Sequence, residues 1–348
     1  MNQRKFDTFQ GVDVIATTLK NKNGCTAEIL NFGGILHSLK VPDKDGMFRD
    51  VVIGHNEVST YIEDGAYLGA LVGRYGNRIR DGKITVNGTE YQLALNNNGI
   101  HHLHGGTVGY SHKIWNIDTV TESSITLSLL DEDGTENYPG TVSVNVTYTL
   151  TDENELSIEY RATTDKDTFF NPTNHSYFNL GGYQGGPVTD HLLTIKADFY
   201  TPTDAGLIPT GEIRSVSGTP FDFRTAKKVG KDLDIDCEDL KFGNGYDHNF
   251  ILGEPNVYKE NACEVYDEKS GILMKVSTDM PAVQLYGGNG LDGSYTGKDG
   301  QPILYRTGLC LETQYSPDTP NQPEFPSCLL KAGENFYSKT VYKFEISK

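Results

Sequence analysis

Apolar residues alternate with other residues at a period of two over many short stretches of this chain. Such alternation places one side of an extended segment in a core and leaves the other side to solvent, as in a strand of an antiparallel sheet. Residues 142–150 and 156–162 both follow the pattern, and the turn-forming sequence Thr-Asp-Glu-Asn separates them. The two stretches therefore predict an antiparallel hairpin.

A second hairpin is predicted over residues 84–91, because Asn87-Gly88 readily adopts the positive φ angles of a tight type I′ turn. Further strands are expected over residues 125–130, 192–197, 272–277, 283–286 and 341–346. Helical periodicity is nearly absent, and only short helical turns are expected, near residues 59–62 and 226–233. Many strands with frequent turns must bury one face against another sheet, so the expected fold class is all-β, a large antiparallel β-sandwich.

One domain spanning residues 1–348 is expected, because no proline-, serine- or glycine-rich linker, no shift in composition and no internal repeat divides the chain. The 38 glycines, 20 tyrosines and 15 phenylalanines are the mixture of turn formers and aromatic residues typical of a β protein. The five cysteines are widely spaced and include no Cys-x-x-Cys pair. Free, reduced and mostly buried thiols are therefore expected, rather than a disulfide framework or a zinc ribbon.

The net charge of −17 argues against nucleic acid and anionic membranes as partners, because both would repel an acidic protein. No apolar run approaches the length of about 18 residues that a transmembrane helix needs, and the first residues lack the apolar core of a secretion signal. A soluble, cytoplasmic protein is expected. The sequence leaves open whether it is a monomer or a homodimer.

Three polar side chains stand where β-prone segments open into loops rich in glycine, proline or asparagine. They are His104 in His-His-Leu-His-Gly-Gly, His175 in Asn-Pro-Thr-Asn-His-Ser-Tyr-Phe, and Glu312 in Leu-Glu-Thr-Gln. Loops of this kind are where a β-scaffold usually presents its catalytic side chains. Together the three supply a proton donor and a proton acceptor, which suits chemistry on a sugar hemiacetal.

Other interpretations of these residues stay open from the sequence alone. His102 and His104 would point to the same face of a strand, so that they and His101 could hold a metal if a carboxylate lay nearby. His175 could be structural, and Glu312 could be a solvated residue at the end of a strand. The polar and aromatic surroundings of His175, and the proline-rich segment that follows Glu312, favour a site instead.

Two charged residues fit the same interpretation. Arg78 lies in Gly-Arg-Tyr-Gly-Asn-Arg and Asp247 lies in Gly-Tyr-Asp-His, so each follows a glycine by two positions. A planar guanidinium and a carboxylate together hold vicinal sugar hydroxyls well. Taken alone, either could be a surface charge.

At this point the motifs resemble those of a known family, the aldose 1-epimerases, also called galactose mutarotases. The resemblance runs nearly from end to end of the chain. It rests on Asn31-Phe-Gly-Gly-Ile, Gly73-Arg-Tyr-Gly-Asn-Arg78, Leu103-His104-Gly-Gly, Asn171-Pro-Thr-Asn-His175-Ser-Tyr-Phe-Asn-Leu, Tyr246-Asp247-His248 and Leu311-Glu312-Thr-Gln. One departure is Gly76, where the family often has a small residue such as alanine.

The resemblance implies an isomerase in which Glu312 is the base and His175 is the acid. It implies that the sugar is bound by Asn77, Arg78, His104, Tyr177, Asp247 and Gln284. Because the reaction needs only proton transfer, no cofactor and no metal is implied. With unperturbed pKa values, Glu312 would set an acidic limit of activity near ~4.3 and His175 an alkaline limit near ~6.5.

The implied substrate is a free aldohexose such as galactose or glucose. Glu312 would take the proton of the C1 hydroxyl while His175 protonates the ring oxygen, and reclosure after rotation about C1–C2 would give the other anomer. Two alternatives differ in their requirements. A hexose-6-phosphate epimerase on the same fold should show extra basic residues for the phosphate, whereas a non-catalytic sugar-binding module would not need an opposed acid and base.

Overall fold

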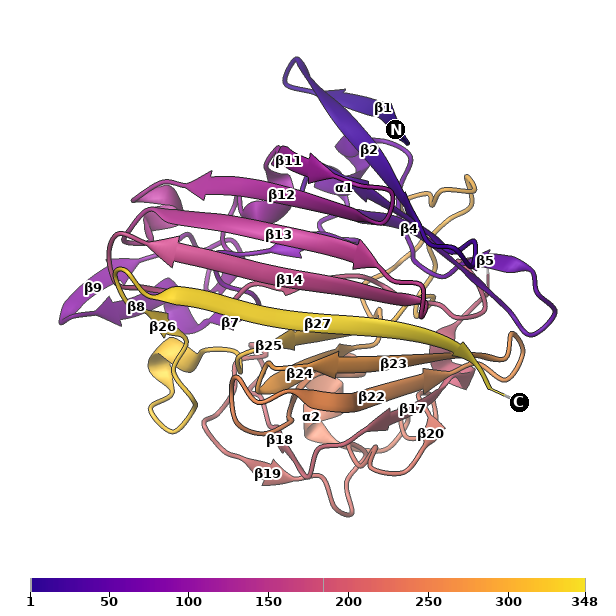
Figure 1. Cartoon of the computed structure of the whole chain (residues 1–348). Helices are drawn as coiled ribbons and strands as arrows, with labels where there is room; N and C mark the ends of the chain where they lie inside the picture. The colour runs from indigo at the N-terminus through magenta and orange to yellow at the C-terminus, as the bar shows by residue number, and fades with distance from the viewer. Residues whose placement is uncertain (1, 184, 348) are drawn as a thin grey trace.

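A computed structural model describes residues 2–183 and 185–347 of the chain. Its largest element is a nine-stranded antiparallel sheet in the order β11-β12-β13-β14-β27-β23-β22-β17-β20 (Figure 1). The strands are β11 (Asn116–Val120), β12 (Ser124–Asp131), β13 (Val142–Leu150), β14 (Glu155–Thr164), β17 (Leu192–Ile195), β20 (Lys227–Lys228), β22 (Lys259–Tyr266), β23 (Ile272–Thr278) and β27 (Asn335–Ile346). β27 lies in the middle, where it pairs with β14 on one side and β23 on the other.

The hairpin expected across residues 151–154 is confirmed as β13 and β14. The two strands pair without interruption from Val142 opposite Thr164 to Leu150 opposite Leu156. Along β13 every second side chain is buried and those between are more exposed. The period-two pattern of the sequence is thus the imprint of a strand with one face in the core.

Two five-stranded sheets complete the main layers. One runs in the order β1 (Gln3–Phe9), β2 (Val12–Lys20), β3 (Thr26–Leu30), β4 (Leu36–Pro42) and β5 (Phe48–Asp50). The other runs in the order β19 (Arg214–Ser215), β18 (Phe199–Thr201), β21 (Asp247–Ile251), β24 (Ala282–Tyr286) and β25 (Cys310–Gln314). Phe250, Val283 and Leu311 of this second sheet belong to the same buried cluster as Val146 and Ile158 of the nine-stranded sheet. The predicted antiparallel β-sandwich is therefore confirmed.

The sheet that contains β25 turns a polar face away from this shared core. Leu311 points into the core, so its neighbour Glu312 points to the opposite face. Gln284 on β24 lies directly opposite Glu312, and Asp247 on β21 lies opposite Tyr286. Asn249 lies opposite Gln284, and Gln314 lies two positions from Glu312. Because residues directly opposite each other in an antiparallel pair share a face, this face gathers three amide and two carboxyl groups.

Short strand pairs bring other segments to the polar face. β16 (Thr173–Asn174) pairs with β6 (Leu71–Val72) and contacts β25, which places the next residue, His175, beside that sheet. β7 (Arg78–Ile79) pairs with β10 (His102–Leu103), and His104 follows at once. These two-residue strands therefore carry both histidines and Arg78.

The second predicted hairpin is confirmed as β8 (Lys83–Val86) and β9 (Thr89–Gln92). Asn87 and Gly88 between them have φ angles of 51° and 78°, as a type I′ turn requires. One further short pair joins β15 (Thr168–Phe169) to β26 (Leu329–Leu330).

Short helical turns were expected in two segments, and the structure differs between them. α1 (Val58–Glu63) confirms the helical turn expected near residues 59–62. The turn expected over residues 226–233 is confirmed only in its second part, where the N–H groups of Lys231 and Leu233 donate to the carbonyl oxygens three residues earlier. In the first part, Lys227 and Lys228 form the edge strand β20 instead. β20 pairs with the free backbone N–H and C=O groups at the edge of β17. The local sequence of residues 226–233 contains no pattern that indicates this pairing. α2 (Glu238–Phe242) was not expected.

The strands expected over residues 125–130, 272–277 and 283–286 are confirmed as β12, β23 and β24. The strand expected over residues 192–197 ends at Ile195, and β27 begins at Asn335 rather than at residue 341.

All five cysteines are free, and Cys25, Cys263, Cys310 and Cys328 are buried, as expected. Within the described part of the chain, no helix has the length and apolar character needed to cross a bilayer.

Candidate active site

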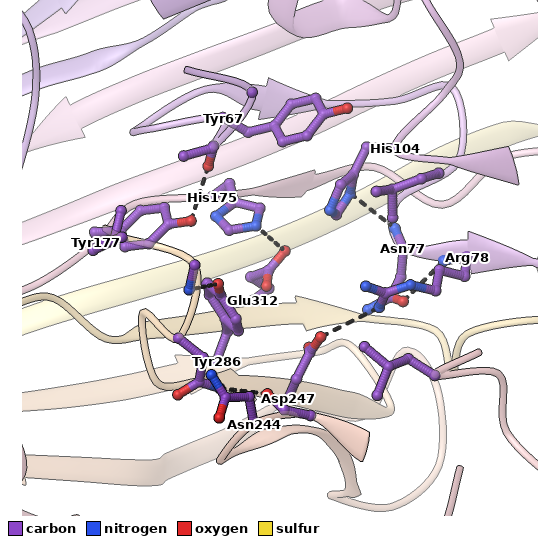
Figure 2. A pocket seen from close by; sticks show the side chains of 18 of the residues that line it. Tyr67, Asn77, Arg78, His104, His175, Tyr177, Asn244, Asp247, Tyr286 and Glu312 are labelled. Carbon is purple, nitrogen blue, oxygen red and sulfur yellow. Dashed lines mark hydrogen bonds and ion pairs between the residues drawn. The ribbon is translucent and has the colours of Figure 1, made fainter. Parts of the chain in front are cut away.

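A cavity of about 350 Å³ opens on the polar face of the β25 sheet (Figure 2). Its walls are formed by Asp64, Gly65, Ala66, Tyr67, Asn77, Arg78, Leu103, His104, His175, Tyr177, Leu207, Gly243, Asn244, Asp247, Tyr286, Asn289, Gly290, Leu291 and Glu312. Every site residue expected from the sequence is among them except Gln284. The expected residues in the wall run from Asn77 to Glu312, so side chains far apart in the sequence meet at one surface.

Glu312 is held in the cavity wall by its strand. β25 fixes its backbone, and the neighbouring Leu311 anchors the strand in the core. The Glu312 side chain is only 2% exposed, and its Oε2 accepts no hydrogen bond. Burial raises the pKa of the Glu312 carboxyl well above its usual value, with a smaller rise from the Asp247 carboxylate, while Arg78 opposes the shift.

His175 faces Glu312, with 3.6 Å between Nε2 and Oε2. Its backbone N–H donates to the carbonyl oxygen of Ala70, which fixes the residue beyond the end of β16. The imidazole lies nearly parallel to the rings of Tyr177, at 5.1 Å, and Tyr67, at 6.1 Å. Its Nδ1 lies 3.4 Å from the thiol sulfur of Cys310. These neighbours leave Nε2 as the nitrogen that faces the carboxyl group.

Burial lowers the pKa of the His175 imidazole to about 4, the opposite direction from Glu312. Both shifts favour the uncharged form of the group, because a charge loses its hydration in the cavity wall. Burial therefore favours a neutral imidazole beside a protonated carboxyl group. This neutral pair holds the same number of protons as an imidazolium beside a carboxylate. Together the two side chains carry one proton that can move.

His104 has a different chemical role, fixed by its backbone. β10 ends at Leu103, and His104 takes a φ of 52°, so its ring does not share a face with His102 as the strand prediction assumed. The backbone N–H of Asn77 donates to His104 Nδ1 at 3.1 Å. A neutral ring must then carry its proton on Nε2. Burial, with His175 and Arg78 nearby, lowers the pKa of His104 well below its usual value, so His104 is a neutral hydrogen-bond donor.

The three neighbouring histidines do not converge on one point. His102 Nδ1 must donate to the carbonyl oxygen of Ala94, and its Nε2 pairs with the Tyr138 hydroxyl. His101 Nδ1 accepts from the backbone N–H of Asp81. The metal site considered for these residues is therefore not formed, because their rings are engaged in separate contacts.

A different trio has metal-ligand chemistry. One atom from each of His104, His175 and Glu312 lies within 4.8 Å of the others. Its weakness as a metal site is His104, whose Nδ1 already accepts from Asn77, so that a metal on Nε2 would have to displace the ring's only proton. The arrangement therefore fits a donor beside an acid and base pair better than three metal ligands.

Arg78 and Asp247 form a clamp across the cavity from the two histidines (Figure 2). Arg78 Nη1 lies 3.4 Å from Asp247 Oδ2, and Arg78 Nε is buried without a partner. The other oxygen of Asp247 accepts from Gln284 Nε2 at 2.7 Å, and Gln284 Oε1 accepts in turn from Gln314. Gln284 therefore lies behind Asp247 and orients it. The unused guanidinium nitrogen leaves a donor for a ligand.

Asn77 joins the clamp to His104. It adopts a φ of 66°, and its side-chain oxygen accepts from the backbone N–H of Arg78. Its own carbonyl oxygen accepts from the backbone N–H of His104. Asn77 thus fixes the backbone of Arg78 and of His104 relative to each other.

Several wall residues were not predicted from the sequence. Tyr286 had an available signal, because it lies two positions from Gln284 on β24 and alternation puts both on one face. Tyr67 lies in Asp-Gly-Ala-Tyr with a φ of 57°, and Leu207 has a φ of 59°. Left-handed backbone at tyrosine and leucine cannot be read from residue type, since both usually avoid it. Asn244 and Asn289 carry no signal beyond a following glycine.

Comparison with known proteins gives consistent matches over almost the whole chain. The family model described as aldose 1-epimerase matches residues 16–343. The galactose mutarotase of Bos taurus is 44% identical over 321 residues, which are 92% of this chain and 91% of that protein. The aldose 1-epimerase of Escherichia coli K12 is 39% identical over 329 residues, 94% of each chain. The crystal structure of galactose 1-epimerase from Lactobacillus acidophilus has a TM-score of 0.86 at 30% identity and covers 100% of this chain and 99% of its own.

Proposed function

Because this chain belongs to the aldose 1-epimerase family, we propose that it interconverts the α and β anomers of free aldohexoses such as galactose and glucose. The observation that carries the proposal is the buried pair of His175 and Glu312, 3.6 Å apart in the wall of a polar cavity. Opening a hemiacetal ring needs one group to accept a proton and another to donate one at the same time. This pair provides both in a site of suitable chemistry.

Ring opening starts from the charged form of the pair, imidazolium beside carboxylate. Glu312 takes the proton of the C1 hydroxyl, His175 Nε2 gives its proton to the ring oxygen, and the C1–O5 bond breaks to leave a free aldehyde. Rotation about C1–C2 then exposes the other face of the carbonyl group. In reclosure the O5 hydroxyl attacks C1 and returns its proton to His175, while Glu312 returns a proton to O1. The pair ends in its starting form.

Burial acts on this cycle in a definite direction. Ring opening turns the ion pair into a neutral pair, the form that burial favours. The charged form gains stability when a sugar fills the cavity and its hydroxyl groups replace lost hydration. The two forms are thereby brought closer in free energy, which lowers the barrier to moving the proton in either direction.

The other wall residues bind and orient the sugar. His104 donates from Nε2 to a sugar oxygen, since its tautomer is fixed by Asn77. Arg78 and Asp247 hold hydroxyl groups as a donor and an acceptor, and Asp247 is itself oriented by Gln284. Tyr177 packs on the His175 ring and keeps Nε2 aimed into the cavity.

The charge of the cavity wall favours an uncharged sugar over a sugar phosphate. Its carboxyl groups are those of Asp64, Asp247 and Glu312, and its guanidinium is that of Arg78, which already contacts Asp247. A phosphate group would meet more acidic than basic groups at short range. The opposed acid and base likewise favour an enzyme over a non-catalytic sugar-binding module.

Polarimetry tests the proposal directly. Freshly dissolved α-glucose and α-galactose should reach rotational equilibrium faster with the protein than without it, and chelator should not change the rate. The matched control is the His175→Asn, Glu312→Gln double variant at the same concentration. Equal rates for the double variant and wild type would contradict the proposal, and so would activity confined to hexose 6-phosphates.

A further inference from the structure

The tight turn from Thr203 to Pro209 carries Leu207 into the cavity wall. Leu207 is half-buried and has a φ of 59°, in the left-handed region that a branched residue adopts only when its surroundings hold it there. Asp204 supplies part of that hold, because its Oδ1 accepts from the backbone N–H groups of Gly206 and Ile208. The Asp204 carboxylate therefore stabilises the tip together with two backbone hydrogen bonds, from Asp204 N–H to Ile208 O and from Leu207 N–H to Asp204 O.

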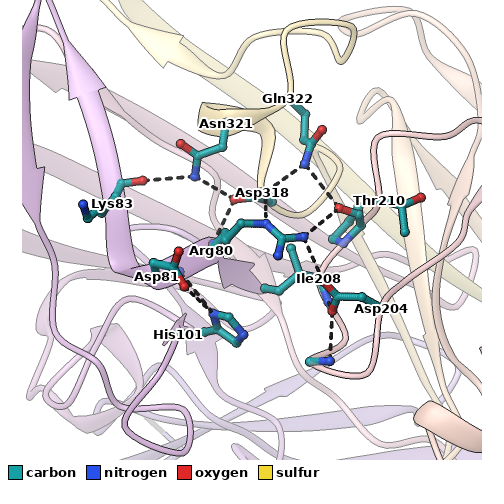
Figure 3. A network of polar contacts seen from close by, with 12 residues as sticks. Arg80, Asp81, Lys83, His101, Asp204, Ile208, Thr210, Asp318, Asn321 and Gln322 are labelled. Atoms are coloured by element: carbon teal, nitrogen blue, oxygen red, sulfur yellow. Dashed lines mark hydrogen bonds and ion pairs between the residues drawn. The ribbon is translucent and has the colours of Figure 1, made fainter.

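Arg80 ties this turn to the rest of the site (Figure 3). Its Nη2 donates to Asp204 Oδ2 at 2.9 Å and lies 3.5 Å from the carbonyl oxygen of Pro209. Its backbone N–H donates to Asp318 Oδ1 at 2.9 Å. Arg80 thus spans the distance between two segments that are far apart in sequence.

Asp318 holds the other side of the network. It is fully buried, and its backbone N–H donates to the carbonyl oxygen of Arg78. Its Oδ2 accepts from Gln322, whose amide also donates to Pro209. The same group of contacts therefore fixes the backbone of Arg78, which belongs to the clamp, and the turn that presents Leu207.

We propose that Leu207 is a further substrate-binding residue, and that Arg80, Asp204 and Asp318 are positioning residues that set it against the sugar. An apolar side chain in a polar wall packs against the C–H groups of a sugar and keeps water from the groups beside it. This role also explains the strained backbone at Leu207. The hydrogen bonds of the network offset the conformational free energy of the left-handed φ angle and hold the side chain against the sugar. This inference rests on the proposed function.

The chain provides a matched control for Asp204. The Oδ1 of Asp43 accepts from the backbone N–H groups of Asp45 and Met47, and its Oδ2 accepts from Arg49 Nε. These are the same offsets along the chain, and the same kind of arginine partner, as at Asp204. Asp43 is not in the cavity wall. An asparagine at either position has only one side-chain oxygen and cannot serve both the backbone and the arginine.

The experiment measures kcat and KM by polarimetry for galactose and glucose, together with Tm, in Leu207→Ala, Leu207→Met, Asp204→Asn and Asp43→Asn. Leu207→Ala should raise KM about fivefold with little change in kcat, the loss expected for a half-buried apolar contact. Leu207→Met conserves volume and should stay within about twofold of wild type. Asp204→Asn should raise KM as Leu207→Ala does, whereas Asp43→Asn should change only Tm.

The outcomes separate the inference from the function beneath it. A wild-type protein without anomer interconversion would overturn the proposed function. An active wild type with an unchanged KM in Leu207→Ala would overturn the contact between Leu207 and sugar. An equal KM in Asp204→Asn and Asp43→Asn would overturn the positioning role. This comparison still tests the inference if Leu207→Ala fails to fold.

Discussion

Glu312 offers the sharpest test at the scale of single residues. Glu312→Gln is nearly isosteric but cannot accept the C1 proton, so kcat should fall by about 10²-fold to 10⁴-fold. Because Oε2 accepts no hydrogen bond, the amide leaves no former donor without its partner there and Tm should change little. Initial rates of optical rotation check the first expectation and thermal unfolding checks the second. Turnover near the wild-type value would remove Glu312 from the reaction.

The two histidines should respond differently to the same substitution. His175→Asn should nearly abolish turnover, since an amide cannot protonate the ring oxygen. His104→Asn keeps a hydrogen-bond donor, and its loss of the Asn77 contact should alter KM while kcat stays measurable. Steady-state kinetics of the two variants, side by side, check this. A dead His104→Asn with an active His175→Asn would reverse the roles.

The pH profile follows from the opposite pKa shifts of the pair. The reactive pair carries one movable proton. As pH falls through about 4, the pKa to which burial lowers His175, the pair takes up a second proton and loses its base. As pH rises through the raised pKa of Glu312, the pair loses its last proton and has no acid.

The window of activity should therefore have an acidic limb set by His175 and an alkaline limb set by Glu312, whose pKa burial raises well above its usual value. A profile of kcat/KM against pH measures it. A narrow bell between about 4.3 and 6.5 would mean that burial does not shift the pair.

Sequence identified the residues whose chemistry is distinctive and missed those defined by backbone shape. His175, Glu312 and Arg78 carry groups that stand out at loop openings, and all three line the cavity. Tyr67 and Leu207 reach the cavity through left-handed φ angles, and their residue types give no sign of this. Gln284 was assigned to the sugar because of the resemblance, yet its amide donates to Asp247 behind the wall.

At the scale of elements, β25 shows how one strand serves stability and chemistry on opposite faces. Leu311→Ala should lower the free energy of unfolding by about 2–5 kcal/mol, because it opens a cavity in the shared core. Leu95, which is 42% exposed, is the control, and Leu95→Ala should change stability by less than about 0.5 kcal/mol. Denaturant unfolding measures both. An equal loss of unfolding free energy in the two variants would mean that the core face of β25 contributes no more to stability than an exposed leucine.

Strand length decided which elements could be predicted. The hairpin of β13 and β14 has enough residues for a period to show, and the Asn87-Gly88 turn has its own chemical signal. β7, β10 and β16 have two residues each, too few for any period, although they position Arg78, His104 and His175 at the site. β20 could not be predicted, because it forms by pairing with the edge of β17 and not from the strand preference of its own residues.

At the scale of the whole molecule, one buried cluster contains residues from Leu19 to Phe344 and draws on all three large sheets. A continuous core of this kind should unfold in a single cooperative transition. Far-UV circular dichroism and the fluorescence of the buried Trp115 should therefore give coincident melting curves. Two separated transitions would contradict the expectation of one domain over residues 1–348.

The order of strands in the nine-stranded sheet could not have been predicted from the sequence. Strands that pair across a long stretch of chain carry no sequence pattern that identifies their partners.

The central place of β27 has a consequence for how the chain reaches its fold during synthesis. β27 joins β14 to β23, so the strands β11 to β14 and the strands β17 to β23 form two half-sheets that wait for a segment translated after both. Until residues 335–346 leave the ribosome, each half presents an unpaired strand edge, which attracts other chains. Nascent chains on crowded polysomes are thus open to intermolecular pairing from the completion of β14 until β27 emerges, and chaperones that shield strand edges would have their greatest effect on yield in that interval.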